Sequence, residues 1–390
     1  MERKIKVTVD SDIPFVNGLL EPFAEVEYMK GREITRERIT DSDALIIRTR
    51  TKCNSQLLEG TKVKFIASAT IGSDHVDLEW CKRAGIFFTN AAGCNAWGVV
   101  QYVISAIFYL YDKLGESPQN KILGIVGAGN VGERLASLAQ NIGMRVLRCD
   151  PPIKSMLEKD PLFFSSAVTA LRDDVSPFKV DRSHLTSDDF FDLDYLLKSS
   201  DIITLHVPLI SSTINMADDN FFSLMKENAI FINSSRGEVV CENSLLKSRE
   251  KLSGIALDVW REEPEINRYL LSVADIATPH IAGYSIQGKI NASILSLRNL
   301  GGFFNLNVLS NLPFEYPEPK TLNFKPSVDS EPYVNLSNLI FTLYDIWEDS
   351  KTLKESPKSF EALRNGYNYR YEYSDEVKEL FDIIIRREYV

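Results

Sequence analysis

The chain has 390 residues, a formal net charge of −10 at pH 7, and hydrophobic and charged contents of 44% and 25% that are ordinary for a globular protein. This length predicts two or three domains, and the acidic balance argues against a nucleic-acid or anionic-membrane surface. The five cysteines form no Cys-x-x-Cys pair and have no metal-ligand spacing, so we expect neither disulfides nor a metal site. The charged start "MERK" is not a signal peptide, and the apolar stretch 98–111 is too short to span a bilayer. We therefore expect a cytoplasmic protein in which residues 98–111 form a helix buried between domains or subunits.

Short apolar runs alternate with helical patterns over residues 1–95. The runs "IKVTVD", "EVEYM", "ALIIRT", "KFIASAT" and "IFFTNA" are typical of buried strands. Segments such as "DLEWCKRAG" between them have helical spacing. The first region therefore predicts a small parallel α/β unit.

A second series of strands follows the apolar stretch. Its members are "ILGIVG", "RVLRCD", "IITLHV", "AIFINSS", "GIALDV" and "DIATPH". Helical patterns lie between most of them, which predicts a second doubly wound sheet with helices on both faces. Residues 153–190 interrupt the series with a polar, irregular stretch that we interpret as a surface insertion. The expected fold class is thus α/β, with two doubly wound parallel-sheet domains.

The composition changes after residue 312. Five of the sixteen prolines fall between positions 313 and 332, which indicates a linker or an arm. Beyond it, "LSNLIFTLYDIW", "YRYEY" and "EVKELFDIIIRREY" predict a small α+β C-terminal unit. We assign residues 313–390 to this unit.

One strand and helix of the second series carry a dinucleotide-binding fingerprint. Gly127, Gly129 and Gly132 have G-x-G-x-x-G spacing between a strand and a helix, and Asp150 ends the next strand 18 residues after Gly132. The glycines permit a tight turn, close approach of a pyrophosphate and helix–strand packing, in that order. Asp150 would accept the ribose hydroxyls of the cofactor and repel a 2′-phosphate, so the pattern predicts NAD rather than NADP.

Three polar side chains lie at or just past strand ends in the second series, where open α/β sheets bind their ligands. Arg236 follows "AIFINSS" and could pair with a substrate carboxylate, although an ion pair within the protein would also explain it. His280 could accept the proton of an alcohol as its carbon gives up hydride. A carboxylate at 262 or 263 could hold the imidazole and stabilise its protonated form, and the residues alone do not decide between Glu262 and Glu263.

The motifs GAGNVG with its aspartate, "NSSRGEVV", "LDVWREEPE" and "TPHIAGY" resemble those of the D-isomer-specific 2-hydroxyacid dehydrogenases. This resemblance implies that Arg236, Glu263 and His280 are catalytic, and it selects Glu263 because the matching glutamate immediately precedes the proline. It also implies that NAD contacts a larger set: Gly127, Gly129, Asn130, Val131, Gly132, Asp150, Val207, Ser234, Ser235, Arg236, Asp258 and Gly283.

The resemblance also implies a division of the chain. Residues 1–95 with about 281–312 would form a flavodoxin-like substrate domain, and 96–280 a Rossmann NAD domain. The region 313–390 would be a dimerisation domain, which makes the expected partner a second copy of the chain.

Further motifs are similar to family members whose substrate is a phosphorylated 2-hydroxy acid. They are "IIRTRTKCN", "SATIGSDHVD", "AAGCNA", "CDPP", "HIAGYSIQGK" and "FEALRNGYNYRYEYS". The match implies that Thr49 and Ser68 contact the substrate and that Tyr284 closes on it. Because such a substrate carries two anionic groups, Arg48, Arg50 or Lys52 could bind the phosphate while Arg236 binds the carboxylate.

The chain departs from the family pattern in three places. The segment 153–190 is long for this connection, and two single residues differ as well. Gln101 replaces an acid, and Tyr371 stands where an arginine is typical. Two alternatives to the phosphorylated-substrate prediction remain open. One is another D-2-hydroxyacid dehydrogenase, such as one acting on 3-phosphoglycerate. In those enzymes a small residue usually follows the glycine after the histidine, whereas this chain has Tyr284. The other is a non-enzymatic protein that senses NAD.

Overall fold

The computed structural model describes residues 4–164, 178, 180–319 and 322–388, and the chain divides into two compact units. The first unit takes its described residues from 1–95 and 286–318, together with Phe178. The second takes them from 96–174, 180–285 and 319–390. Within the described part of the chain, no helix is both long and apolar enough to cross a bilayer.

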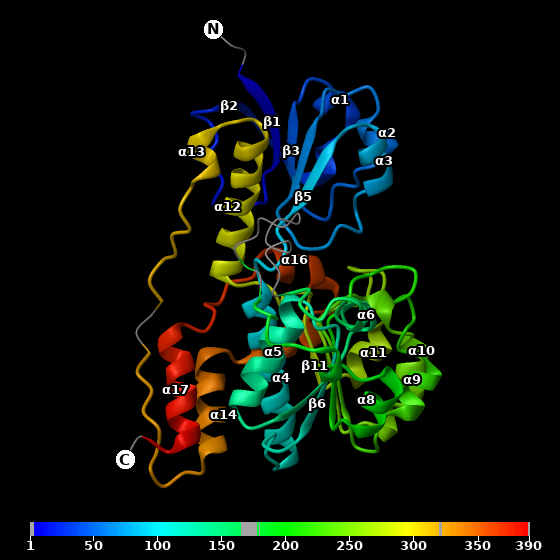
Figure 1. Cartoon of the computed structure of the whole chain (residues 1–390), viewed down its shortest axis with the longest axis vertical. Coiled ribbons are helices and arrows are strands. Elements are labelled where there is room, and N and C mark those ends of the chain that lie inside the picture. Colours follow the sequence, from blue (N-terminus) through cyan, green and yellow to red (C-terminus); the bar gives the residue numbers. More distant parts are fainter. Residues whose placement is uncertain (1–3, 165–177, 179, 320–321, 389–390) are drawn as a thin grey trace. The chain divides into compact units, whose positions relative to one another are not determined.

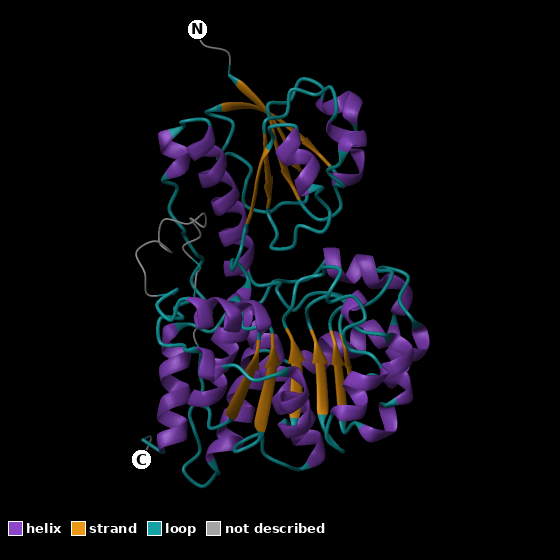
Figure 2. Cartoon of the chain, turned by 45° about the vertical axis from the view of Figure 1, so that its right-hand side comes forward, coloured by secondary structure: helices purple, strands orange, loops and turns teal. Residues whose placement is uncertain are grey.

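The first unit is built on a five-stranded parallel sheet in the order β2-β1-β3-β4-β5 (Figure 2). Its strands are β1 (Ile5–Asp10), β2 (Ala24–Met29), β3 (Ala44–Ile47), β4 (Phe65–Ser68) and β5 (Phe87–Asn90). Every residue of β3 and β4 is buried, as expected for central strands covered on both faces. This strand order is the flavodoxin-like one, so the predicted parallel α/β unit is confirmed.

Helices cover both faces of this sheet. The helices before β5 are short: η1 (Gly31–Glu33), α1 (Arg36–Ile39), α2 (Ser55–Leu58) and α3 (Leu78–Arg83). The later chain adds α12 (Ile286–Phe303) and α13 (Asn307–Ser310), which lie beside the first strands (Figure 1). Leu297 and Leu300 of α12 are fully buried in one core with residues of β1, β3 and β4. Burial of these leucines explains why a segment so late in the chain returns to the first sheet.

The second unit contains a six-stranded parallel sheet in the order β11-β10-β9-β8-β6-β7 (Figure 2). Its strands are β6 (Ile122–Val126), β7 (Arg145–Cys149), β8 (Ile202–Leu205), β9 (Ile230–Asn233), β10 (Gly254–Leu257) and β11 (Ile276–Ala277). After β7 the chain returns to the other side of β6. The strand order therefore reverses between β6 and β8, and the crevice at such a switch point is where doubly wound sheets bind ligands.

The connections in this unit are mostly helical. They contain α5 (Asn130–Asn141), α6 (Pro151–Lys159), η2 (Ser187–Asp189), α8 (Leu193–Ser199), α9 (Asp219–Leu224), η3 (Gly237–Val239), α10 (Glu242–Lys247), η4 (Arg249–Lys251) and α11 (Arg268–Val273). The alternation of helices with parallel strands confirms the predicted second doubly wound sheet.

The predicted insertion is more regular at its start than expected. Residues up to Lys159 continue the helix α6, because Asp150 caps it by accepting a hydrogen bond from Ile153 N (3.1 Å) and Pro151 occupies its first position. The prediction of an irregular stretch from residue 153 is therefore wrong for residues 153–159, which are helical. Residues 165–177 and 179 of the remaining segment lie outside the described residues.

The apolar stretch 98–111 forms most of α4 (Ala96–Leu114), which is buried over nearly its whole length. Its neighbours are α5 on one side and two C-terminal helices, α14 (Pro332–Leu343) and α15 (Ile346–Glu355), on another. The predicted buried helix is thus present, but the expectation that it lies between domains is wrong, because α5, α14 and α15 bury it inside the second unit.

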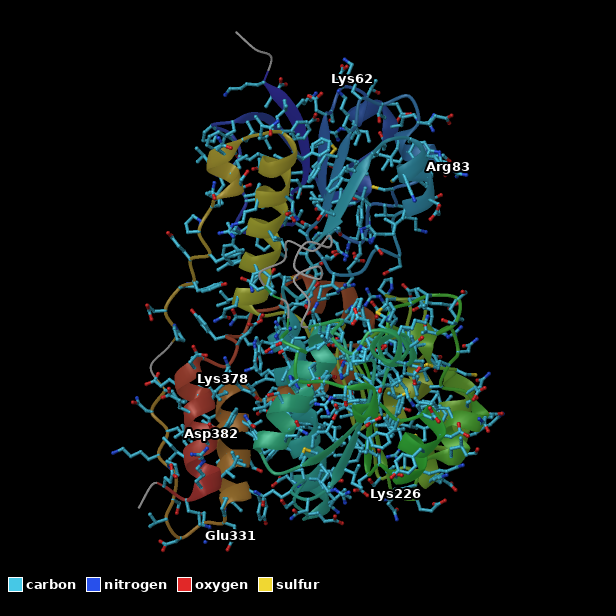
Figure 3. All side chains as sticks on the ribbon, in the orientation of Figure 1. Lys62, Arg83, Lys226, Glu331, Lys378 and Asp382 are labelled. Carbon is cyan, nitrogen blue, oxygen red and sulfur yellow. The ribbon has the colours of Figure 1, made fainter. Side chains whose placement is uncertain are left out.

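The C-terminal residues add α14, α15, η5 (Pro357–Ser359), α16 (Phe360–Asn365) and α17 (Asp375–Arg386) to the second unit (Figure 1). The β part of the predicted α+β unit is absent from the described residues, where "YRYEY" forms only an isolated bridge between Arg370 and Ser285. Val377, Phe381 and Ile384 are buried on one face of α17, whereas Lys378 and Asp382, both labelled in Figure 3, are only partly buried.

Candidate active site

The loop from β6 into α5 has the geometry of a dinucleotide-binding turn. Gly127 has a φ of +95°, and a Cβ on it would lie 2.5 Å from the carbonyl oxygen of His206. A Cβ on Gly132 would lie 2.1 Å from the carbonyl oxygen of Gly127. Around Gly129, by contrast, there is open space within 4 Å of a Cβ. The outer glycines are thus required by the turn and by helix packing, and the middle one leaves the backbone accessible to a ligand.

The groups predicted to hold the rest of a dinucleotide gather at this loop. Asp150 accepts a hydrogen bond from Ala128 N at 3.0 Å, which places its carboxylate beside the glycine turn. Asn130 and Val131 begin α5, whose first N–H groups carry the positive end of the helix dipole. Val207 lies next to Gly127 at the end of β8. The residues present therefore fit NAD at the switch point.

The turn "NSSR" after β9 is organised by Asn233, a residue that the sequence analysis did not single out. Its Oδ1 accepts from Ser235 N (3.0 Å) and Ser235 Oγ (2.8 Å), and its Nδ2 donates to Arg236 O (2.9 Å). The buried Oγ of Ser234 has no hydrogen-bond partner within the described part of the chain, so its predicted contact with NAD stays a prediction. The signal for Asn233 was its place as the last, polar residue of an apolar strand.

His280 and Glu263 form a direct pair. The imidazole Nδ1 lies 2.7 Å from Glu263 Oε2, while Glu263 Oε1 accepts a hydrogen bond from Trp260 N at 3.0 Å. The side chain of His280 is 27% exposed, so the ring is neither enclosed in the core nor open to solvent. Glu263, and not its neighbour Glu262, is thus the carboxylate that contacts the imidazole.

The electrostatics of Glu263 favour its ionised form. Burial raises the pKa of Glu263, but the charge of His280, the hydrogen bond with it and the charge of Arg364 together bring that pKa below its ordinary value. Glu263 is therefore a carboxylate at neutral pH. As an acceptor it holds a proton on Nδ1 of His280 and leaves Nε2 as the basic nitrogen.

Asp258 organises the loop that carries His280. Its carboxylate accepts from Thr278 Oγ1 (2.7 Å), Ile281 N (2.7 Å) and Ala282 N (2.9 Å), and its carbonyl oxygen accepts from His280 N (2.8 Å). Burial raises the pKa of Asp258 against the opposing effects of the His280 charge and these hydrogen bonds. Asp258 is only 1% exposed, so any effect on NAD would pass through the loop that also contains Gly283.

Tyr284, at the end of this loop, contacts an arginine from the C-terminal segment. Arg364 Nε donates to the Tyr284 hydroxyl at 3.1 Å, and Arg364 Nη1 lies 3.5 Å from Glu263 Oε2. Arg364 belongs to the motif "FEALRNGY", which the sequence analysis quoted without assigning this residue a role. A contact between residues so distant along the chain leaves no signal in one sequence.

The first unit contains the other predicted substrate residues. Thr49 follows β3 and is partly exposed, as a ligand-binding residue at a strand end should be. Ser68 is fully buried, and its hydroxyl lies 2.7 Å from Thr70 Oγ1 and 3.2 Å from His75 Nε2. Thr70 is less buried, so its hydroxyl is better placed than that of Ser68 to meet a ligand.

Arg48 is engaged within the protein. Its Nε lies 3.1 Å from Asp10 Oδ2 and its Nη2 lies 2.6 Å from Asp12 Oδ2. Two carboxylates already neutralise the guanidinium, so these ion pairs account for Arg48 without a substrate. Its predicted contact with a phosphate stays a prediction, and this geometry weakens it.

Known proteins share both the sequence and the fold. The family described as D-isomer specific 2-hydroxyacid dehydrogenase, NAD binding domain, matches residues 168–282. The chain is 40% identical over 378 residues to the erythronate-4-phosphate dehydrogenase of Bacteroides thetaiotaomicron, covering 94% of this chain and 97% of that protein. It is 36% identical over 382 residues to that of Escherichia coli, covering 95% and 93%. The solved NAD+-bound 3-phosphoglycerate dehydrogenase of Entamoeba histolytica has the same fold, with a TM-score of 0.60 and 24% identity over 82% of this chain and all of that one.

Proposed function

Because the chain belongs to the erythronate-4-phosphate dehydrogenases within the D-isomer-specific 2-hydroxyacid dehydrogenase family, we propose that it oxidises 4-phospho-D-erythronate to 2-oxo-3-hydroxy-4-phosphobutanoate. The family makes it an NAD-dependent dehydrogenase, in agreement with the dinucleotide fingerprint. The relatives act on erythronate 4-phosphate by name. We propose in addition that the reaction serves pyridoxal phosphate biosynthesis.

The observation that carries the proposal is the pair of His280 and Glu263. When bound, NAD supplies the acceptor for the hydride that leaves the substrate carbon. His280 Nε2 takes the hydroxyl proton, because Nδ1 is held at 2.7 Å from Glu263. The Glu263 carboxylate then stabilises the imidazolium that forms. Arg236, at the end of β9, binds the substrate carboxylate through its guanidinium.

The phosphate needs a second anion site, which we assign to the loop that follows β3 in the first unit. Thr49 offers a hydroxyl there, and Arg48, Arg50 or Lys52 would offer the charge, with Arg48 also paired to Asp10 and Asp12. Ser68, at the end of β4, stays a proposed substrate contact, although it is fully buried and its hydroxyl lies 2.7 Å from that of the less buried Thr70.

The organisation of the chain supports further proposals. We assign residues 1–95 with about 281–312 to substrate binding and 96–280 to NAD binding. Residues 313–390 would serve dimerisation, so the working molecule would be a homodimer. We also place it in the cytoplasm as a proposal. Sedimentation at micromolar concentration tests the homodimer, and a monomer would contradict it.

Turnover tests the reaction itself. Protein, NAD and 4-phospho-D-erythronate are mixed and NADH absorbance is followed, beside parallel reactions with 3-phosphoglycerate and D-lactate. We expect NADH from 4-phospho-D-erythronate at a far higher kcat/KM than from the other two acids. Rapid turnover of 3-phosphoglycerate alone would overturn the substrate assignment. Binding of NAD without turnover of any 2-hydroxy acid would instead favour a protein that only senses NAD.

A further inference from the structure

The helix α16, which carries Arg364, is anchored in the core of the second unit. Phe360 at its start is 1% exposed and shares a hydrophobic core with strands of the NAD-binding sheet, and Leu363 packs against the same core. These apolar residues, three positions apart, lie on one face of the helix. Arg364 follows on an adjacent position, with its side chain only 19% exposed. Its place is thus set by burial of its neighbours.

The guanidinium of Arg364 joins two groups of the candidate site. One nitrogen, Nε, donates to the hydroxyl of Tyr284 at 3.1 Å. Another, Nη1, lies 3.5 Å from Oε2 of Glu263, the same oxygen that contacts His280 Nδ1 at 2.7 Å. A planar guanidinium with several donors suits such a double contact, whereas an ammonium group could not hold both partners in one plane.

Neighbouring residues of the same segment hold the rest of the histidine loop. The ring of Tyr284 meets those of Tyr367 and Tyr369 at centroid distances of 6.1 and 6.0 Å. The buried Arg370 donates to the carbonyl oxygens of Ile281 (3.1 Å) and Ala282. The loop after His280 is therefore fixed from outside the NAD-binding sheet, by residues late in the chain.

We propose that Arg364 is a positioning residue of the reaction, which holds the Glu263 carboxylate and the Tyr284 hydroxyl in one arrangement beside His280. The C-terminal segment thereby completes the catalytic site of its own chain, in addition to any part it has in dimerisation. This inference rests on the proposed function, since it takes His280 as the base.

The positioning role has consequences that a purely structural ion pair lacks. The cation beside Glu263 helps to keep this carboxylate ionised, so its removal raises the pKa of Glu263. As the pH falls, the carboxylate is then protonated earlier, at a higher pH than in the wild type. The acid limb of the pH–rate profile therefore shifts to higher pH. An ion pair that only supports the fold would lower the stability and leave the pH profile of the remaining activity unchanged.

The test compares Arg364→Gln and Arg364→Lys with the control Arg387→Gln, which removes an exposed ion pair with Glu331 in the same segment. For Arg364→Gln we expect kcat to fall about 10- to 100-fold and the acid limb to move to higher pH. The dissociation constant of NAD, measured by fluorescence titration, should change by less than about twofold, because Arg364 contacts no part of the glycine turn. Arg364→Lys should recover part of kcat, because its charge remains near Glu263 while the contact with Tyr284 is lost.

A double-mutant cycle with Tyr284→Phe adds an independent readout. Arg364 and Tyr284 contact each other, so their effects on KM for the substrate should be non-additive, while Arg387→Gln and Tyr284→Phe should be additive. Additive effects together with a wild-type pH profile in Arg364→Gln would overturn the inference. If Arg364→Gln does not fold, Arg364→Lys and Tyr284→Phe decide, and an unchanged kcat and KM in both would overturn it.

The outcome is separable from that of the proposed function. A protein without turnover, or one in which His280→Ala keeps full activity, contradicts the proposed function. A protein in which His280→Ala abolishes turnover while Arg364→Gln resembles the wild type contradicts only the role of Arg364.

Discussion

The glycine turn at 127–132 and the histidine loop at 278–285 both follow strands of the six-stranded sheet, yet different contacts fix their conformations. The turn depends mainly on its own glycines, since a Cβ on Gly132 would collide with the backbone of Gly127, and only its start contacts the distant residues His206 and Asp150. The histidine loop is held by distant groups, among them the Asp258 carboxylate and Arg370. A local turn can therefore be predicted from a short motif, whereas the conformation of a loop fixed by long-range contacts cannot.

The largest expected effect is the loss of the base in the histidine loop. His280→Ala should lower kcat by about 10²- to 10⁴-fold, because Nε2 can no longer accept the hydroxyl proton. NAD affinity, measured by titration of protein fluorescence, should stay within about twofold, since the glycine turn is untouched. Equal loss of NAD binding and turnover would mean that His280 supports the fold rather than the chemistry.

Glycine substitutions separate the two demands on the turn. Gly132→Ala should destabilise the protein and abolish NAD binding, because its Cβ would lie 2.1 Å from Gly127 O. Gly129→Ala should leave the thermal midpoint unchanged, since no heavy atom of the described chain lies within 4 Å of the new Cβ. It should weaken NAD binding by about tenfold or more, because the methyl group meets the cofactor. Calorimetry measures the thermal midpoint of each variant, and titration with NAD measures its affinity for the cofactor. Gly302→Ala, with equally open surroundings in helix α12 of the first unit, serves as the control: it should leave NAD binding unchanged and should not lower the thermal midpoint, because alanine is favoured over glycine in a helix.

The charge of Glu263 links the histidine loop to pH. Its pKa is below the ordinary value of 4.5 in the folded chain, so its ionised form adds stability above pH 4.5, and this is lost as pH falls through the folded pKa. Glu263→Gln should therefore have a lower thermal midpoint than the wild type at pH 7, with the difference shrinking below pH 4.5. A difference that is constant across pH 3 to 7 would contradict this linkage.

The smallest expected effect concerns Gln101, where the family resemblance implies an acid. Its Oε1 accepts from Arg370 Nε at 3.2 Å, but its buried Nε2 has no partner within the described residues. Gln101→Glu removes that unsatisfied donor and places a carboxylate beside a buried guanidinium, so it should stabilise the protein by about 1 kcal/mol. Denaturant unfolding measures this gain, and destabilisation would show that burial of the new charge outweighs its pairing.

Several features of the fold could be predicted from sequence because they depend on local spacing. The alternation of apolar runs with helical segments predicted both parallel sheets, and the spacing of Gly127, Gly129 and Gly132 predicted the turn. The failures have physical causes as well. "YRYEY" has the composition of a strand, but Arg370 is buried against loop carbonyl oxygens and its segment forms only a bridge. Residues from 153 read as irregular, yet Asp150 and Pro151 start a helix there.

The candidate site shows the same division. Sequence motifs marked Arg236, Glu263 and His280, and they drew attention to Tyr284. They could not show that Arg48 is neutralised by Asp10 and Asp12, or that Ser68 is fully buried. Those outcomes depend on which side chains meet after folding.

The sequence by itself determined the two sheets, the NAD fingerprint and the residue types of the chemistry, because each follows from spacing along a few tens of residues. Only the tertiary structure placed the Glu263 carboxylate, which the family resemblance had implied, at the imidazole of His280, and only it brought Arg364 to Glu263 and Tyr284. Such contacts join residues separated by 17 to about 100 positions, and burial of apolar faces elsewhere in the molecule, such as that of Phe360, sets their geometry.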